Sequence, residues 1–303
     1  MIVAPRTRGL RGLIRDIALG RSLRARQFDL AIDFHGGPRA SLLTWLSGAP
    51  TRIGYQIAGR GWMYTQRVAR PRELRARHSV ENQWDLLAPL EIAAPDRTTF
   101  PLQMTVNPAT TAAVGDRLRR AGVGAHDALL VIHVSAGNPF RRWPSRHFVE
   151  LIVALALGDE RRRIVVTSGP SEQDAAARVI ADAQGRLGAS RAGQLVSCGE
   201  FSIAELRALV DRAALYIGGD SGPLHIAATS AVPIVGLYGP TLPARSAPWR
   251  DPCHPTESVD AGALPCRPCD QRVCAPGDFR CLTRIEPARV ADAAERALGA
   301  GHG

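Results

Sequence analysis

The chain has 303 residues, 45% of them hydrophobic, which is enough for one large domain or two of ordinary size with a buried core. No run approaches the ~18 continuous apolar residues that cross a bilayer, and the N-terminus lacks the apolar core of a secretory signal, so we expect a soluble, cytoplasmic protein. The formal net charge is +10 and all 38 basic residues are arginine. This charge fits either a biased amino-acid usage or a partner rich in phosphate or carboxylate groups.

The N-terminal third predicts alternating helices and strands. Residues 6–27 place Leu10, Leu13, Ile14 and Ile17 at helical spacing among arginines. We favour a helix packed on a sheet through this stripe, and the alternative is a basic amphipathic helix on a membrane surface. The elements expected after it are a strand at 28–36, a helix at 39–49, a strand at 51–55 and a helix at 78–92 that Pro89 kinks or ends.

Two prolines and little periodicity mark residues 96–108, so we place a domain boundary near residue 105, between domains 1–105 and 106–303. The second domain repeats the alternation, which indicates an α/β fold built on a parallel sheet. Ser202 and Glu205 have the spacing of a capping box at the start of a helix. The strands expected in this part are at 129–135, at 163–169, near Val196, at 213–217 and at 233–238, with helices between them.

Polar loops follow three of these strands. In open parallel sheets, ligands bind beyond the carboxyl ends of the strands, so neighbouring strands would bring such loops to one crevice. The three loops are residues 135–137 followed by Arg141, residues 167–169 followed by Glu172, and residues 218–222 followed by His225.

Each of these groups has a role available in a nucleotide site. Glycines and free N–H groups at a helix start admit phosphate, and Arg141 or Arg142 can form a forked contact with a diphosphate. Glu172 can accept hydrogen bonds from a ribose, and Asp220 can hold a sugar hydroxyl. His225 lies one helical turn beyond Ser221, so both can face the same side. Singly, these residues also fit a helix cap, a core histidine or a solvated carboxylate, but their recurrence at three strand ends favours a site.

Four segments carry a resemblance to a known family. Residues 218–241, GGDSGPLHIAATSAVPIVGLYGPT, contain an Asp-Ser-Gly-x-x-His block, and residues 135–151, SAGNPFRRWPSRHFVEL, place a basic pair before Trp-Pro. Residues 28–55, FDLAIDFHGGPRASLLTWLSGAPTRIGY, and residues 266–290, CRPCDQRVCAPGDFRCLTRIEPARV, complete the set. In this order they resemble glycosyltransferase family 9, the bacterial heptosyltransferases of lipopolysaccharide core synthesis.

This resemblance implies two facing Rossmann-like domains of the GT-B type. The C-terminal domain would hold an ADP-heptose or related donor, and the N-terminal domain an anionic lipid A–core acceptor. Transfer would invert the sugar without a catalytic metal or another cofactor, and arginine-rich surfaces would favour peripheral contact with the anionic inner membrane. The donor-binding residues implied by the match are Arg141 in place of a frequent lysine, Glu172, Phe201 near the adenine, Asp220, Ser221, Gly222 and His225. Ser135, from the first of the three polar loops, completes the predicted donor-binding set.

One part of the family pattern has no counterpart. The family usually begins with a strand and a Gly-Asp loop that supplies an acidic catalytic residue, and nothing in residues 1–28 matches it. We expect an incomplete N-terminal domain, through a misassigned start or a truncated variant. Asp29 and Asp33 do not match the expected loop, so no catalytic residue is assigned. The alternative function is therefore a donor-binding protein whose transfer is ~10²–10⁴-fold weaker or absent.

Acceptor-side candidates are fewer. Arg39 follows the strand that ends near Gly36, and His78, Glu81 and Asn82 share one helical face. The sequence leaves two interpretations open. Arg39, His78 and Asn82 either contact an anionic acceptor or are ordinary polar residues of the surface.

Four cysteines form the pattern Cys266-x2-Cys269-x4-Cys274-x6-Cys281. Disulfides are unusual in the cytoplasm, and four thiolates can hold zinc in a tetrahedral site. We favour a structural staple of the C-terminal tail. A zinc-stabilised nucleic-acid-binding protein is the rival interpretation, but no nucleic-acid-binding motif accompanies the cysteines, so we expect no nucleic-acid partner.

Overall fold

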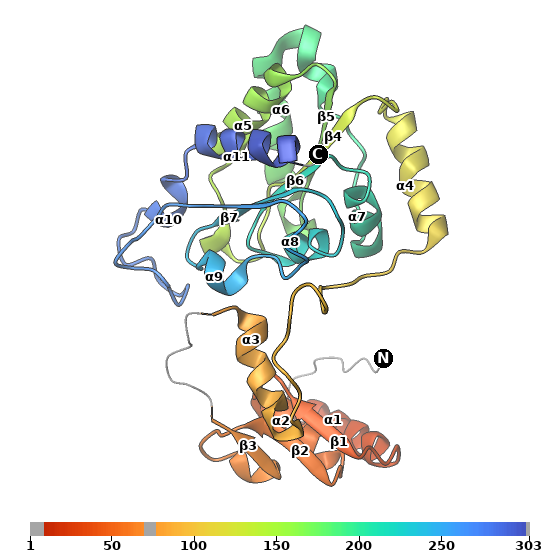
Figure 1. Ribbon diagram of the computed structural model, residues 1–303, viewed down its shortest axis with the longest axis vertical. Coiled ribbons are helices and arrows are strands. Elements are labelled where there is room, and N and C mark those ends of the chain that lie inside the picture. Colours follow the sequence, from red (N-terminus) through yellow and green to blue (C-terminus); the bar gives the residue numbers. More distant parts are fainter. Residues whose placement is uncertain (1–8, 70–76, 301–303) are drawn as a thin grey trace. The chain divides into compact units, whose positions relative to one another are not determined.

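A computed structural model describes residues 9–69 and 77–300, so residues 6–8 of the first expected helix lie outside the described residues. The chain divides into two compact units, residues 1–95 and 96–303 (Figure 1). The division falls after Pro95 rather than near residue 105. The segment that follows belongs to the second unit, where the Leu102 N–H donates to the Trp249 carbonyl at 3.2 Å and the Trp249 indole donates to the Phe100 carbonyl at 2.9 Å.

The N-terminal unit contains a parallel three-stranded sheet in the order β1 (Leu30–Asp33), β2 (Thr51–Tyr55) and β3 (Gln66–Val68), of which β3 was not predicted. The helix expected at 78–92 is shorter. It ends at Trp84 and continues as a 3₁₀ turn, because Pro89 has no N–H to donate, and Glu91 then turns left-handed. The helices of this unit are α1 (Gly9–Arg24), α2 (Pro38–Leu46) and α3 (Ser79–Trp84), with 3₁₀ turns η1 (Gly61–Met63) and η2 (Asp85–Leu90).

Helix α1 packs through its glycines and not through its apolar stripe. Gly20 faces α2 so closely that a Cβ there would lie 2.6 Å from the Cβ of Leu46. The predicted stripe is exposed by contrast, with Leu10 at 74% and Ile17 at 37%. The favoured prediction that this stripe packs on the sheet is therefore wrong. The close contact between α1 and α2 is made at Gly20, because only a residue without a side chain fits there. No helix within the described ranges has both the length and the apolar character to span a membrane.

The C-terminal unit is a five-stranded parallel sheet in the order β5–β4–β6–β7–β8. The strand expected near Val196 is only an isolated bridge between Leu195 and Ile164, and β8 was not predicted. The strands are β4 (Ala128–His133), β5 (Arg162–Thr167), β6 (Leu215–Gly219), β7 (Ile234–Tyr238) and β8 (Thr256–Asp260). The helices are α4 (Pro108–Arg120), α5 (Ser145–Gly158), α6 (Gln173–Arg191), α7 (Ile203–Val210), α8 (Gly222–Ala227), α9 (Pro243–Ser246), α10 (Arg280–Thr283) and α11 (Pro287–Ala300).

Helices cover both faces of this sheet, with α5, α6 and α11 on one side and α4, α7 and α8 on the other (Figure 1). Successive strand residues point to opposite faces, so Leu130 and Ile132 join the first core while Leu129 and Val131 join the second. Burial on both faces explains why the strands are continuous apolar runs. The parallel order also brings the carboxyl ends of β4, β5 and β6 to one edge.

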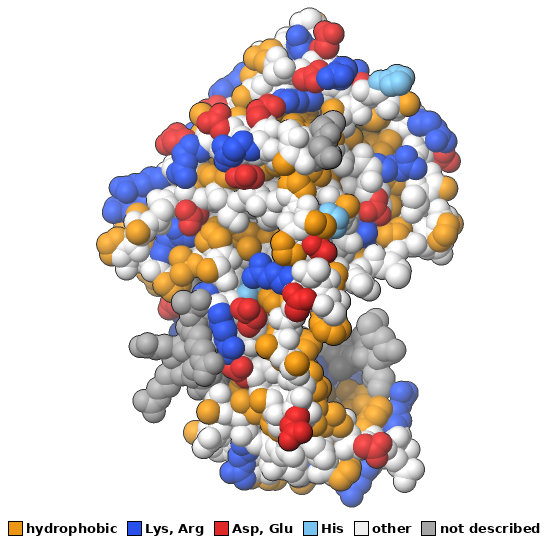
Figure 2. Space-filling view, in the orientation of Figure 1, with side chains coloured by type: hydrophobic (Ala, Val, Ile, Leu, Met, Phe, Trp, Pro, Cys, Tyr) orange, Lys and Arg blue, Asp and Glu red, His pale blue; other side chains and the backbone are white. Residues whose placement is uncertain are grey.

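Several arginines of this unit form ion pairs with carboxylates. Arg162 pairs with Glu295 at 2.7 Å, and Arg163 pairs with Asp127 at 3.1 Å. Figure 2 shows basic and acidic side chains interspersed over the visible face of the unit. The arrangement spreads the basic charge over this face instead of concentrating it in one block.

The capping box predicted for α7 is confirmed. The Ser202 hydroxyl accepts from the Glu205 N–H at 3.3 Å, and the Glu205 carboxylate accepts from the Ser202 N–H at 2.8 Å. These hydrogen bonds from Ser202 also lower the pKa of Glu205 below its ordinary value.

Ser202→Ala should lower the free energy of unfolding by about 1 kcal/mol, because one N–H of the first turn of α7 loses its acceptor. Urea denaturation followed by circular dichroism measures the change. Ser190→Ala, at an exposed serine of α6, is the matched control and should leave the free energy nearly unchanged. Equal effects of the two substitutions would contradict the role of the cap.

Candidate functional site

The three polar loops meet, because β4 lies between β5 and β6. They border a cavity of about 590 Å³, within the range of small-molecule sites. The predicted residues that line it are Ser135, Glu172, Phe201, Ser221 and Gly222. Arg141, Asp220 and His225 are not in the lining and form a linked group beside it.

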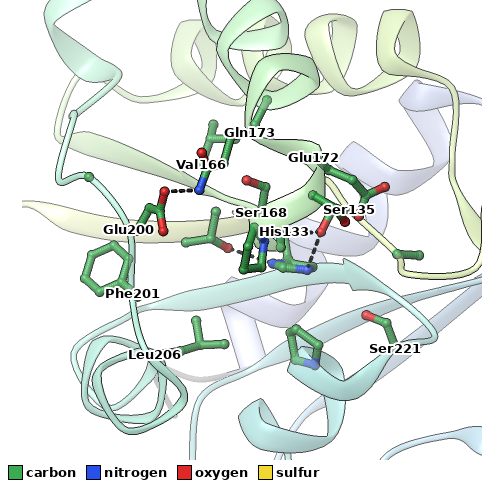
Figure 3. Close-up of a pocket in the computed structure, with 18 of the residues that line it drawn as sticks. His133, Ser135, Val166, Ser168, Glu172, Gln173, Glu200, Phe201, Leu206 and Ser221 are labelled. Atoms are coloured by element: carbon green, nitrogen blue, oxygen red, sulfur yellow. Dashed lines mark hydrogen bonds between the residues drawn. The ribbon is translucent and has the colours of Figure 1, made fainter. Parts of the chain in front are cut away.

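The cavity has an aromatic end, where Glu200 lies beside Phe201, and a polar end with hydroxyl groups and the Glu172 carboxylate. Phe201 and Leu206 lie at one end, while Ser135, Glu172 and Ser221 lie toward the other (Figure 3). The Arg117 guanidinium carbon lies 4.1 Å from the Phe201 ring centroid, a cation–π contact that helps to hold the aromatic side chain in place. A planar apolar group and a polar or charged group on one ligand would fit these two ends.

His133 organises the floor of the polar end. Its Nδ1 lies 3.0 Å from the Thr167 hydroxyl and its Nε2 lies 3.0 Å from the Ser135 hydroxyl, so it links the ends of β4 and β5 (Figure 3). The Ser135 oxygen also accepts from the Gly169 N–H at 2.7 Å. Burial lowers the pKa of His133 to about 4, so the imidazole is neutral at pH 7. If Nε2 carries the proton, Ser135 accepts two hydrogen bonds and its own O–H is left to donate to a ligand.

Asp220 is the centre of the linked group. Its carboxylate is 4% exposed, accepts from the Thr241 hydroxyl at 2.6 Å, and lies 3.3 Å from Nη1 of Arg141 and 3.7 Å from Nε2 of His225. Burial opposes ionisation, but hydrogen bonds from His225 and Thr241 and the charge of Arg141 hold the pKa of Asp220 below its ordinary value. The carboxylate is therefore ionised and fixes the guanidinium at the end of β6.

Glu172 forms an ion pair that the sequence did not predict. Its Oε1 lies 2.5 Å from Nε of Arg142, and the same nitrogen donates to the Ala136 carbonyl at 2.9 Å. This ion pair joins the loops after β4 and β5, and it leaves Glu172 in the lining of the cavity.

The turn after β6 is not a simple helix cap. Ser221 occupies the N-cap position of α8, but its hydroxyl donates to the Gly219 carbonyl at 3.2 Å and caps no backbone N–H. A Cβ at Gly219 would lie 3.3 Å from the Arg141 carbonyl, so glycine permits this close approach of the two loops. The first residue of α8, Gly222, opens onto the cavity.

The acceptor-side candidates have structural partners. Arg39 makes a bidentate contact with Asp16 of α1, with Nη2 to Oδ1 at 2.7 Å and Nε to Oδ2 at 3.0 Å. His78 is buried and caps α3 by accepting from the Val80 N–H at 3.2 Å. Asn82 is buried and exchanges hydrogen bonds with Arg77. The interpretation of His78 and Asn82 as ordinary surface residues is wrong, because both side chains are buried.

Asp33 is likewise committed to its own unit. Its Oδ1 accepts from the N–H groups of His35 and Gly36, and its Oδ2 accepts from the Tyr64 hydroxyl at 2.6 Å. Burial and the hydrogen bond to Asp33 raise the pKa of Tyr64 to about 12. The network fixes the loop after β1, where Gly36 has a φ of +70°.

Comparison with known proteins decides the family. A model of glycosyltransferase family 9, the heptosyltransferases, matches residues 17–277. The chain belongs to this family. It is 31% identical over 252 residues to lipopolysaccharide heptosyltransferase 3 of Escherichia coli, an alignment that covers 82% of this chain and 70% of that protein.

Solved structures share the fold. A family 9 glycosyltransferase from Veillonella parvula has a TM-score of 0.75 at 22% identity, covering 94% of this chain and 78% of that one. The E. coli heptosyltransferase WaaC, solved with ADP, has a TM-score of 0.62 at 19% identity, covering 95% and 79%. These similarities confirm the α/β architecture of the GT-B type. The family 9 chain is accordingly a glycosyltransferase of the heptosyltransferase type.

Two residues of the site were missed from the sequence. His133 was included only as part of an expected strand, although a histidine that ends an apolar strand is itself a signal of a buried polar network. Thr241 holds Asp220 from the loop after β7, and no spacing along the chain indicates a contact between residues so far apart.

The neutral state of His133 makes a pH-dependent contribution to stability. Its unfolded pKa is near 6.5 and its folded pKa is about 4, so the folded state binds fewer protons between these values. Stability is fully present above pH 6.5 and falls as the pH drops toward 4, with a loss of about 2 kcal/mol between pH 7 and pH 5.

His133→Gln should remove this part of the pH dependence, because glutamine does not titrate. Urea denaturation at pH 7 and pH 5 measures it as a difference from the wild-type chain. His126→Asn, at an exposed histidine before β4, should retain the wild-type pH dependence. A His133→Gln protein that loses as much stability as the wild type on acidification would contradict the buried neutral imidazole.

Proposed function

We propose that this chain is an inverting glycosyltransferase that moves a heptose or related sugar from an ADP-sugar to a lipopolysaccharide core or similar anionic glycan. The two-ended cavity of the C-terminal unit carries the proposal. Phe201 offers a face for a base, and the Arg141–Asp220 pair provides a fixed cation beside the polar end. The ADP bound to the E. coli relative supports the assignment of the donor.

The chemistry of the donor half follows from these groups. Departure of ADP leaves negative charge on its diphosphate, and Arg141 is held by Asp220 where it can stabilise that charge. Ser135, with His133 neutral, can donate its O–H to a phosphate oxygen. Glycines at the turn after β6 let the backbone approach the ligand. We assign donor binding to the predicted set, with no metal or other cofactor in the reaction.

We assign the acceptor to the N-terminal unit and leave the general base without a residue. The carboxylate of Asp33 already accepts four hydrogen bonds, from His35, Gly36, Ser41 and Tyr64, so we assign it the role of positioning the loop after β1. The exposed apolar stripe of α1, set among arginines, fits peripheral contact with an anionic inner membrane from the cytoplasmic side. We propose no nucleic-acid partner.

A second candidate is a donor-binding protein with weak or no transfer. The observation that favours it is the Asp33 carboxylate, which is engaged in hydrogen bonds within the N-terminal unit, so that no residue is assigned as the base. In this candidate the C-terminal unit binds the donor, whereas transfer also needs a base and an acceptor site.

Calorimetry with ADP tests the site. Phe201→Ala should weaken ADP binding about 10-fold, since stacking of a base on an aromatic ring contributes about 1–3 kcal/mol. Asp220→Asn should weaken it by about 10-fold or more, since hydrogen bonds to charged groups contribute about 1.5–3 kcal/mol. Phe100→Ala and Asp116→Asn, at exposed residues outside the cavity, are matched controls. Unchanged affinity in both site variants would show that ADP binds elsewhere.

Radiolabelled ADP-heptose and core-deficient lipopolysaccharide distinguish the two candidates. We expect label to enter the lipopolysaccharide, and Asp220→Asn to reduce the rate. ADP binding without incorporation of label would favour the donor-binding protein.

A further inference from the structure

Arg141, in the loop after β4, is held at two of the three nitrogens of its guanidinium. Its Nε donates to the Gln271 side-chain oxygen at 2.7 Å. Its Nη1 donates to the Asp220 carbonyl at 3.1 Å and lies 3.3 Å from the Asp220 carboxylate. Among the described residues, this leaves Nη2 as the nitrogen without a partner. Arg141 therefore offers a ligand its charge and one nitrogen, whereas a forked contact with a phosphate needs two.

The next residue, Arg142, is held at the opposite end of its guanidinium. Its Nε donates to the Ala136 carbonyl at 2.9 Å and lies 2.5 Å from Oε1 of Glu172. In the parts of the chain that the structure describes, its Nη1 and Nη2 have no hydrogen-bond or ion-pair partner, and the side chain is 42% exposed. The contacts at Nε restrain the guanidinium and leave both terminal nitrogens open to a ligand, which is the fork that Arg141 lacks.

The open fork of Arg142 lies beside the polar end of the donor cavity. Both residues that hold its Nε, Ala136 and Glu172, line this cavity. Among the described residues of the lining, the side chains that carry charge at pH 7 are the carboxylates of Glu172 and Glu200. A carboxylate repels a diphosphate placed next to it, and a cation paired with that carboxylate offsets the repulsion. Arg142 meets both needs, because it pairs with Glu172 and still presents two nitrogens to a phosphate.

We propose that Arg142 binds the diphosphate of the nucleotide-sugar donor through its two terminal nitrogens. Glu172 is then a positioning residue that holds the guanidinium, in addition to its predicted contact with the ribose. Arg141 supplies its charge and one nitrogen from the side of Asp220. This inference rests on the proposed function, because it assigns a further binding residue to the same cavity.

Calorimetry with ADP tests the assignment. Arg142→Gln should weaken ADP binding about 10-fold or more, since it removes the charge and the fork together. Arg142→Lys keeps the charge and should recover only part of that loss, because an ammonium group is a point charge without a planar fork. Arg146→Gln, at an exposed arginine of α5, is the matched control and should bind ADP as the wild type does.

Adenosine separates a phosphate contact from a structural role. It lacks the diphosphate, so its affinity, measured by NMR titration, should be the same in the wild type and in both Arg142 variants. An equal loss of adenosine and ADP affinity would overturn the assignment, because Arg142 would then only hold the loop. Full ADP affinity in Arg142→Gln would overturn the contact, and full affinity in Arg142→Lys would overturn its forked geometry. A wild-type chain that binds no ADP would instead contradict the proposed function.

Discussion

The ionised carboxylate of Asp220 is the interaction on which the site depends. It lies at the end of β6, is almost fully buried, and receives Thr241 from the loop after β7 and Arg141 from the loop after β4. Removing a charge from water is costly unless it is paired and hydrogen-bonded, so these partners must stay in place. One buried charge thereby sets the relative positions of three loops and holds the Arg141 guanidinium at the end of β6.

The sequence predicted the parts of the site that follow from local rules. Apolar runs with polar ends predicted β4, β5 and β6, and the rule for parallel sheets predicted that the loops after them meet. The sequence could not predict that His78 and Asn82 are buried, or that the apolar stripe of α1 is exposed. Both results depend on tertiary contacts. In α1 the contact with α2 is made at Gly20, against Leu46, and the hydrophobic periodicity of the sequence does not reveal it.

The two units differ in how their polar groups are used. In the C-terminal unit, neutral His133 and ionised Asp220 support groups that border or adjoin a cavity. In the N-terminal unit, the side chains of Asp33, His78 and Asn82 all make hydrogen bonds that fix loops or helix ends. All the residues that line this cavity belong to the unit of residues 96–303.

The central claim is that the carboxyl ends of β4, β5 and β6 bind the nucleotide of an ADP-sugar. A crystal structure of the chain with ADP tests it most directly. The account predicts the adenine against Phe201 and the diphosphate between Ser135 and Arg141, with Asp220 still holding the guanidinium. ADP bound away from this cavity, or with its diphosphate at the Phe201 end, would contradict the account.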